Sequence, residues 1–166
     1  MRYSYLDGND FVNGEGTSVS LWLQGCPHHC KGCHNPETWD LFGGTFIQYE
    51  ELADKISDAL NANGVHRNFS LLGGEPLAPM NIYYTNLIGY YVQLNHKDSK
   101  IYLWTGYTME ELNKMDKSYR ACLDWADVII DGRYHESERD VALKLRGSKN
   151  QRIWRKIDGK WKVCES

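Results

Sequence analysis

Hydrophobic residues change their spacing several times along the chain, and each change marks a predicted secondary-structure element. Residues 18–25, SVSLWLQG, are rich in strand-forming residues and predict a strand that ends in a loop. Residues 47–63 place Leu52, Ile56 and further apolar residues at helical spacing and close with Asn-Gly. This second segment predicts an amphipathic helix that ends at the Asn-Gly pair.

The alternation of strand and helix continues through the middle of the chain. We expect, in order, a strand at 67–76, a helix at 81–96, a strand at 100–107, a helix that starts at Thr108 and a strand at 126–134. Thr108 precedes Glu111 by three residues, which is the pattern of a capping box. Residues 152–164 alternate around an Asp-Gly pair and predict a hairpin with a tight turn. This order indicates right-handed βαβ units and a mainly parallel sheet.

Unusual loops follow four of the predicted strands. The first strand leads into a cysteine-rich loop, and the others lead into Gly-Gly-Glu-Pro (73–76), Thr105-Gly106 and Asp131-Gly132. Chemistry in sheets of this kind collects at the carboxyl ends of the strands. The four loops therefore predict a single active site.

Composition narrows the class of protein. The chain has 166 residues, with 42% hydrophobic residues, 25% charged residues and a net charge of −3, which is the mix of one soluble globular domain over 1–166. The small net charge argues against a nucleic-acid partner. The sequence holds neither an apolar run of membrane-spanning length nor a secretory signal, so we expect a cytoplasmic protein without a membrane partner.

Three cysteines are concentrated in the stretch LQGCPHHCKGCHN. Cys26, Cys30 and Cys33 have the spacing C-x3-C-x2-C, and the other two cysteines, Cys122 and Cys164, are distant in sequence. Cytosolic thiols stay reduced, so the cluster favours metal binding over disulfides. In a four-iron cluster, three thiolates would hold three irons and leave the fourth iron open to a substrate.

Structural zinc is the alternative for this cysteine cluster. Zinc takes four tetrahedral ligands, and His28, His29 or His34 could supply the fourth. A histidine so close to the cysteines in sequence is poorly placed to close the tetrahedron, and a second separated ligand pair is missing. The residues alone leave both metals open and favour the iron cluster.

The Gly-Gly-Glu-Pro loop adds a second chemical feature. Gly73 and Gly74 would let the backbone approach a ligand closely, and the Glu75 carboxylate can face a cationic group such as an amine. A plain tight turn with a surface glutamate is the alternative interpretation.

Together, C-x3-C-x2-C and the later GGEP resemble the radical S-adenosylmethionine enzymes. Within them, residues 10–40, DFVNGEGTSVSLWLQGCPHHCKGCHNPETWD, are similar to the anaerobic ribonucleotide reductase activating proteins. The segments LLGGEPL, LWTGY, ADVIIDGRY and LRGSKNQRIW follow in the order of that group. Many superfamily members have an aromatic residue just before the third cysteine, whereas this chain has Gly32 there and His34 after it, as that group commonly does. The resemblance covers nearly the whole chain.

The resemblance implies a fold and a set of site residues. The fold would be a single α/β domain, an incomplete (β/α) barrel of the radical S-adenosylmethionine type with a mainly parallel sheet and a C-terminal hairpin. Cys26, Cys30 and Cys33 would bind a [4Fe-4S] cluster whose open iron is chelated by S-adenosyl-L-methionine. The residues implied to contact that cofactor are Gly32, Cys33, His34, Gly73, Gly74, Glu75 and Thr105, with Gly106 beside the last.

The implied activity is that of an enzyme. An external reductant would supply one electron to the cluster, and S-adenosylmethionine would be cleaved to methionine and a 5′-deoxyadenosyl radical. That radical would take hydrogen from a glycine on the large subunit of anaerobic ribonucleoside-triphosphate reductase. The alternatives are another small radical enzyme, such as a deazaguanine-forming synthase or a formate-lyase-type activase, and a zinc-binding interaction module.

Overall fold

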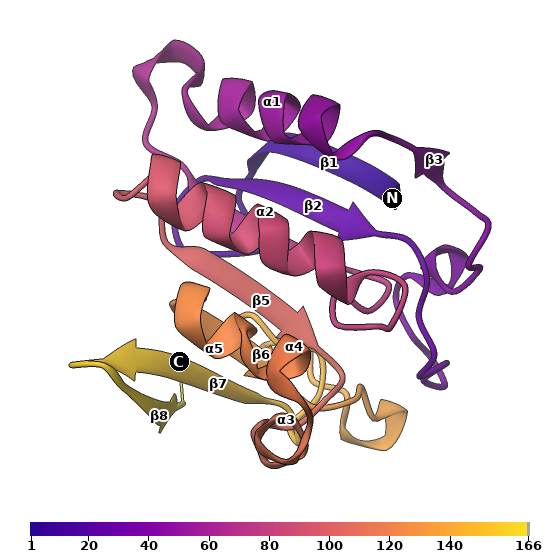
Figure 1. Ribbon diagram of the computed structural model, residues 1–166. Helices are drawn as coiled ribbons and strands as arrows, with labels where there is room; N and C mark the ends of the chain where they lie inside the picture. Colours follow the sequence, from indigo (N-terminus) through magenta and orange to yellow (C-terminus); the bar gives the residue numbers. More distant parts are fainter. Residues whose placement is uncertain (166) are drawn as a thin grey trace.

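A computed structural model describes residues 1–165, and its centre is one mixed sheet of eight strands (Figure 1). The strands are β1 (Arg2–Asp10), β2 (Ser18–Leu23), β3 (Thr45–Phe46), β4 (Asn68–Gly73), β5 (Ile101–Thr105), β6 (Val128–Asp131), β7 (Arg152–Ile157) and β8 (Lys160–Cys164). The helices are α1 (Tyr49–Leu60), α2 (Ile82–Asn95), α3 (Met109–Lys114), α4 (Lys117–Arg120) and α5 (Cys122–Trp125). Short 3-10 turns cover Pro36–Thr38, Ala62–Gly64 and Glu136–Glu138.

The parallel part of the sheet lies at its centre. Strands β2, β4, β5 and β6 run parallel, whereas β1 and β3 on one side and β7 and β8 on the other pair antiparallel. The prediction of a mainly parallel sheet is thus confirmed only for these four strands. The sheet is open, with β3 and β8 at its edges, so the predicted incomplete barrel is not confirmed. Antiparallel strands end the βα repeat on both sides, and the sheet does not close on itself.

The elements predicted from periodicity are present. The strands at 18–25, 67–76, 100–107 and 126–134 appear as β2, β4, β5 and β6, and the helices at 47–63 and 81–96 appear as α1 and α2. Thr108 and Glu111 form the predicted capping box, and the 152–164 hairpin is β7–β8. Sequence analysis missed β1, whose residues are mostly half-exposed and so lack a hydrophobic alternation. The two-residue β3 and the four-residue helices α4 and α5 were missed as well.

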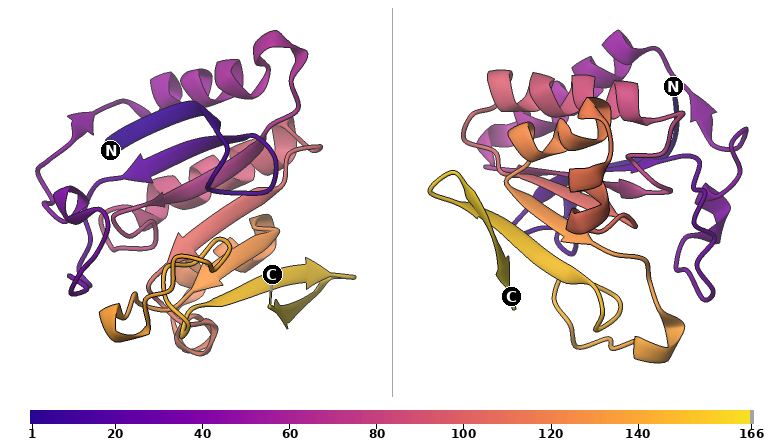
Figure 2. Two further views of the ribbon diagram at one scale, coloured as in Figure 1. Left: turned by 180° about the vertical axis from the view of Figure 1, so that it is seen from behind. Right: turned by 60° about the horizontal axis from the view of Figure 1, so that its bottom comes forward.

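The two faces of the sheet are covered differently. Alternate strand residues such as Leu21, Leu71 and Leu103 face the helices and form the main core with them. Figure 2 shows the helices gathered over this face, with the strands in front when the molecule is seen from behind.

No helix among residues 1–165 is long and apolar enough to span a membrane.

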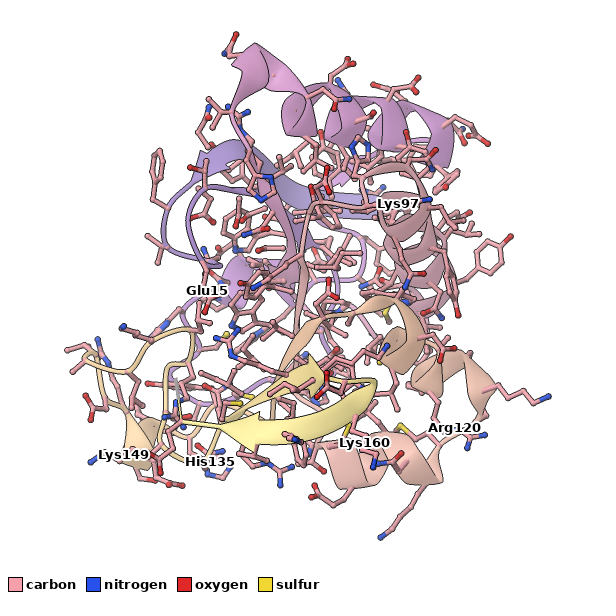
Figure 3. All side chains as sticks on the ribbon, turned by 90° about the vertical axis from the view of Figure 1, so that its left-hand side faces the viewer. Glu15, Lys97, Arg120, His135, Lys149 and Lys160 are labelled. Carbon is pink, nitrogen blue, oxygen red and sulfur yellow. The ribbon has the colours of Figure 1, made fainter. Side chains whose placement is uncertain are left out.

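Two loops cover parts of the opposite face, namely residues 10–17 and 133–151. In the first loop, the Ser70 hydroxyl donates to the Asn13 carbonyl at 2.6 Å, and Glu15 accepts from the Tyr102 hydroxyl at 2.9 Å. In the second, the Trp104 indole donates to the Leu145 carbonyl at 2.7 Å. Figure 3 labels Glu15 in the first loop and His135 and Lys149 in the second. This arrangement leaves a groove between the loops and the sheet.

Candidate functional site

The four predicted loops meet in one hollow at the carboxyl ends of the parallel strands. Its volume is about 130 Å³, and it opens into a neighbouring groove of about 440 Å³. The groove has the size of a small-molecule site, for which about 300–1,000 Å³ is typical. The residues lining the hollow are Cys26, His28, Cys30, Cys33, Trp39, Gly73, Gly74, Glu75, Trp104, Thr105, Gly106, Gly132, Arg133, Tyr134 and Gln151. The four loops therefore lie together as the sequence predicts, and their role as one active site stays a prediction.

The three clustered cysteines are free and line this hollow together. The pKa of the Cys26 thiol is raised to about 11, mainly by burial and to a smaller extent by the charge of Glu75. Burial also raises the pKa of Cys30, with Cys33 adding to the rise. The Cys33 sulfur accepts a hydrogen bond from the Asn35 amide at 3.4 Å. The thiols would have to lose their protons on binding a metal, as is usual for cysteine ligands.

The three thiols line the hollow, but they do not form a site for a single metal ion. Within residues 1–165, no three His, Cys, Asp or Glu side chains are grouped closely enough to hold a single metal ion. The histidines considered as a fourth zinc ligand are directed elsewhere: His28 contacts Glu75, His29 stacks on Trp39 and His34 packs on Tyr134. The arrangement does not resemble a closed tetrahedral site.

Close backbone packing joins the cysteine loop to the Gly-Gly-Glu-Pro turn. The Glu75 amide donates to the Gly25 carbonyl at 2.8 Å. Gly73 has φ = +84°, and a Cβ at this position would lie 2.5 Å from the Cβ of Trp22. A Cβ on Gly74 would collide with the carbonyl group of Gly25. Both glycines are thus required by the close approach of β2 and β4, and they leave backbone exposed at the wall of the hollow.

The Glu75 carboxylate is buried, with 1% of the residue exposed, and it accepts four hydrogen bonds from the protein. Oε1 accepts from the Leu77 amide at 2.9 Å and from the Thr105 hydroxyl at 2.8 Å. Oε2 accepts from the Gly106 amide at 2.7 Å and lies 2.8 Å from His28 Nε2. Since both oxygens are fully engaged, the carboxylate ties three loops together.

The other site residues predicted from the sequence differ in whether they line the hollow. Thr105 is buried and its hydroxyl is committed to Glu75. His34 is exposed and lies in the neighbouring groove. Gly32 does not line the hollow, and a Cβ there would lie 2.8 Å from a carboxylate oxygen of Glu136. The cysteines and the 73–75 turn therefore form the centre of the site, with Gly32 and His34 at its outer side.

Sequence reasoning missed several residues of the wall, among them Trp104, Arg133 and Tyr134, and it named Gln151 only as part of a polar run that faces the partner, the cofactor or solvent. Arg133 and Tyr134 follow directly after the Asp131-Gly132 strand end, so the strand-end rule could have identified them. Gln151 lies nearly twenty positions later and accepts from the Gly147 amide at 2.9 Å, a contact that the sequence does not signal.

The chain matches a family model described as a 4Fe-4S single cluster domain over residues 12–154, so it is a member of a class of iron–sulfur proteins. Its relatives narrow that class. The chain is 40% identical to the anaerobic ribonucleoside-triphosphate reductase-activating protein of Vibrio cholerae over 156 residues, which cover 93% of this chain and 98% of the relative. The proteins of the same description from Enterobacteria phage T4 and Escherichia coli K12 are 36% and 34% identical, over 98% and 91% of this chain and 99% and 96% of their own lengths. The chain belongs to the family of anaerobic ribonucleoside-triphosphate reductase-activating proteins.

Proposed function

We propose that this chain is a radical S-adenosylmethionine enzyme that generates the glycyl radical of an anaerobic ribonucleoside-triphosphate reductase. The observation that carries the proposal is that three free thiols share one hollow with the glycine-rich turn at the end of the next strand. When bound, a [4Fe-4S] cluster and S-adenosylmethionine would supply reductive cleavage to a 5′-deoxyadenosyl radical, with the electron coming from an external reductant. The family match and the names of the relatives support the same proposal.

The donor set fits the cluster. Cys26, Cys30 and Cys33 offer three sulfur ligands and leave one iron for a substrate, which matches ligation of a four-iron cluster by thiolates. A single zinc ion would need a fourth ligand, and His28, His29 and His34 contact Glu75, Trp39 and Tyr134 instead. A zinc-binding interaction module is therefore the weaker candidate.

In this proposal, the glycine-rich turn binds the methionine part of the cofactor through its backbone. Gly73 and Gly74 expose backbone groups at the hollow, whereas the Glu75 carboxylate is occupied within the protein. Glu75 and Thr105 act by holding the turn in place. Gly32 and His34, which flank Cys33, contact the outer side of the cofactor. No side chain is required as a general acid or base.

The groove on the sheet face opposite the helices supports the proposal that the reductase binds this chain. It shares Cys33, Gly73 and Trp104 with the hollow, and it extends past Val12 and Val141, which are 76% and 85% exposed. An extended glycine-bearing segment of the reductase could enter here and reach the cofactor. The partner would also cover the hollow, because a radical must be kept from water and small hydrogen donors.

We propose that residues 1–166 form a single domain, because one core cluster joins the helices to most strands.

The proposal is tested by anaerobic reconstitution with iron and sulfide, chemical reduction and addition of S-adenosylmethionine. We expect about four irons per chain, as for one [4Fe-4S] cluster, and formation of 5′-deoxyadenosine. Addition of the reductase should then give a glycyl radical in electron paramagnetic resonance (EPR) spectra. Cys26→Ser, Cys30→Ser and Cys33→Ser should each lose these activities, while Cys164→Ser, outside the hollow, should retain them.

Three results would contradict the proposal. Full cluster content in all three serine variants would refute the ligand assignment. A colourless zinc protein that yields no deoxyadenosine would favour the interaction module. Deoxyadenosine formation without a radical on the reductase would indicate another small radical enzyme, such as a deazaguanine-forming synthase or a formate-lyase-type activase.

A further inference from the structure

We infer that His28 is a positioning residue that fixes the cysteine loop against the ends of β4, β5 and β6. The inference rests on the proposed function and adds a role for a side chain between two proposed cluster ligands, Cys26 and Cys30. His28 acts through two hydrogen bonds, donating through Nε2 and accepting at Nδ1, and through close packing on Gly106.

The hydrogen bonds define the state of the imidazole ring. Arg133 Nε lies 3.2 Å from His28 Nδ1, and an arginine N–H can only donate, so Nδ1 must accept. The ring hydrogen therefore sits on Nε2, which lies 2.8 Å from Glu75 Oε2 and donates to it. His28 thus bridges a buried carboxylate at the end of β4 and a guanidinium just beyond β6.

The ring also fills a space that is shaped for it. A Cβ on Gly106 would lie 2.6 Å from His28 Nε2, so only glycine admits the ring at this position. On another side, the Tyr107 ring meets the imidazole edge-to-face at a centroid distance of 4.8 Å. Arg133 is held in turn by Glu111 at the start of α3, at 3.2 Å. The side chain has little freedom to adopt another rotamer.

The position of His28 matters because it lies between two proposed ligands, two residues after Cys26 and two residues before Cys30. All three residues line the hollow. His29 lies in the left-handed region with φ = +47°, so the chain turns sharply directly after His28. Fixing the His28 side chain therefore fixes the turn that presents Cys26 and Cys30 to the hollow. Outer groups that orient metal ligands commonly matter by about 10–100-fold in metal affinity or activity.

The test compares four variants of the reconstituted full chain. His28→Ala removes both hydrogen bonds. His28→Gln can keep the donor to Glu75, and His28→Asn can keep the acceptor for Arg133. His29→Asn is the matched control, since this neighbouring residue is exposed and asparagine tolerates its positive φ.

Three readouts are measured: the rate of cluster loss to a chelator, the EPR spectrum of the reduced cluster with and without S-adenosylmethionine, and the fold by circular dichroism. We expect His28→Ala to lose its cluster about tenfold faster than the unmodified chain and to show an altered spectrum with the cofactor. His28→Gln and His28→Asn should each restore part of the effect. His29→Asn should match the unmodified chain.

A chelator rate within twofold of the unmodified chain and an unchanged spectrum in His28→Ala would overturn the inference. If His28→Ala does not fold, Arg133→Gln is measured in its place. The Arg133 side chain is half-exposed, so this substitution disturbs the fold less. It should lose the cluster about threefold faster than the unmodified chain. If the unmodified chain forms neither a cluster nor deoxyadenosine, the proposed function is refuted. If the unmodified chain forms both and His28→Ala keeps its cluster equally well, only the positioning role is refuted.

Discussion

Gly106→Ala provides a direct test of the packing around the cysteine loop. The new Cβ would lie 2.6 Å from His28 Nε2 and 3.1 Å from its Cγ, whereas ordinary contact begins near 3.4 Å. The closest ring atom is Cδ2, so the ring would have to retreat by about 1 Å while Glu75 and Arg133 hold its two nitrogens. Overpacking of this kind costs about 1–3 kcal/mol, and we expect about 2 kcal/mol of lost stability. Gly106 does not have a positive φ, so backbone strain adds little.

The assay is urea unfolding of four chains: unmodified, Gly106→Ala, His28→Ala and the double variant. Once the imidazole is removed, the added methyl group has space, so most of the Gly106→Ala penalty should disappear in the double variant. The expected coupling energy is about 1–2 kcal/mol, well above the roughly 0.5 kcal/mol error of additivity for independent sites. Additive effects of the two substitutions would refute the reasoning.

Two further predictions concern parts of the molecule away from the hollow. Gly89→Ala should destabilise the chain by about 1–3 kcal/mol in urea unfolding, even though alanine favours helix, because its Cβ would overlap Cδ2 and Cε2 of the buried Trp125 ring. A stabilised variant would contradict this packing. Hydrogen bonds from Arg152 lower the pKa of Glu110 to about 2, so the stability from this pair should be present above pH 4.5 and be lost as the pH falls from 4.5 toward 2. Because Glu110 is largely exposed, the loss should be about 0.5 kcal/mol, and it should be absent in Glu110→Gln when unfolding is followed between pH 2 and 6.

The sequence predicted the alternating centre of the fold because its physical signals are local. Apolar spacing defines α1 and α2, and the rule that parallel strands end at one edge brought the cysteine loop and the 73–76 turn together. The flanks lacked such signals. β1 has only one buried residue, Asp10, so its pairing with β2 is determined by contacts that no local pattern reveals.

The roles of individual site residues were harder to predict. Sequence reasoning assigned the Glu75 carboxylate to a bound amine. In the structure only its Leu77 partner is local, and the other three lie 47 positions before it at His28 and 30 and 31 positions after it at Thr105 and Gly106. Such long-range partners become neighbours only when the sheet has formed. His28 was considered only as a zinc ligand for the same reason, since neither Glu75 nor Arg133 is near it in the chain.

The contact between Glu15 and Arg155 has a consequence for the order of events during synthesis. It joins residues 140 positions apart at 2.6 Å, from the loop before β2 to the hairpin after β6. Neighbouring strands of the central sheet can pair as the chain emerges from the ribosome, because each follows the last along the sequence. The 10–17 loop gains this anchor only after the hairpin is released. The groove wall nearest the first loop is therefore among the last parts of the protein to mature, and a ribosome that stalls before β7 would leave it unfinished.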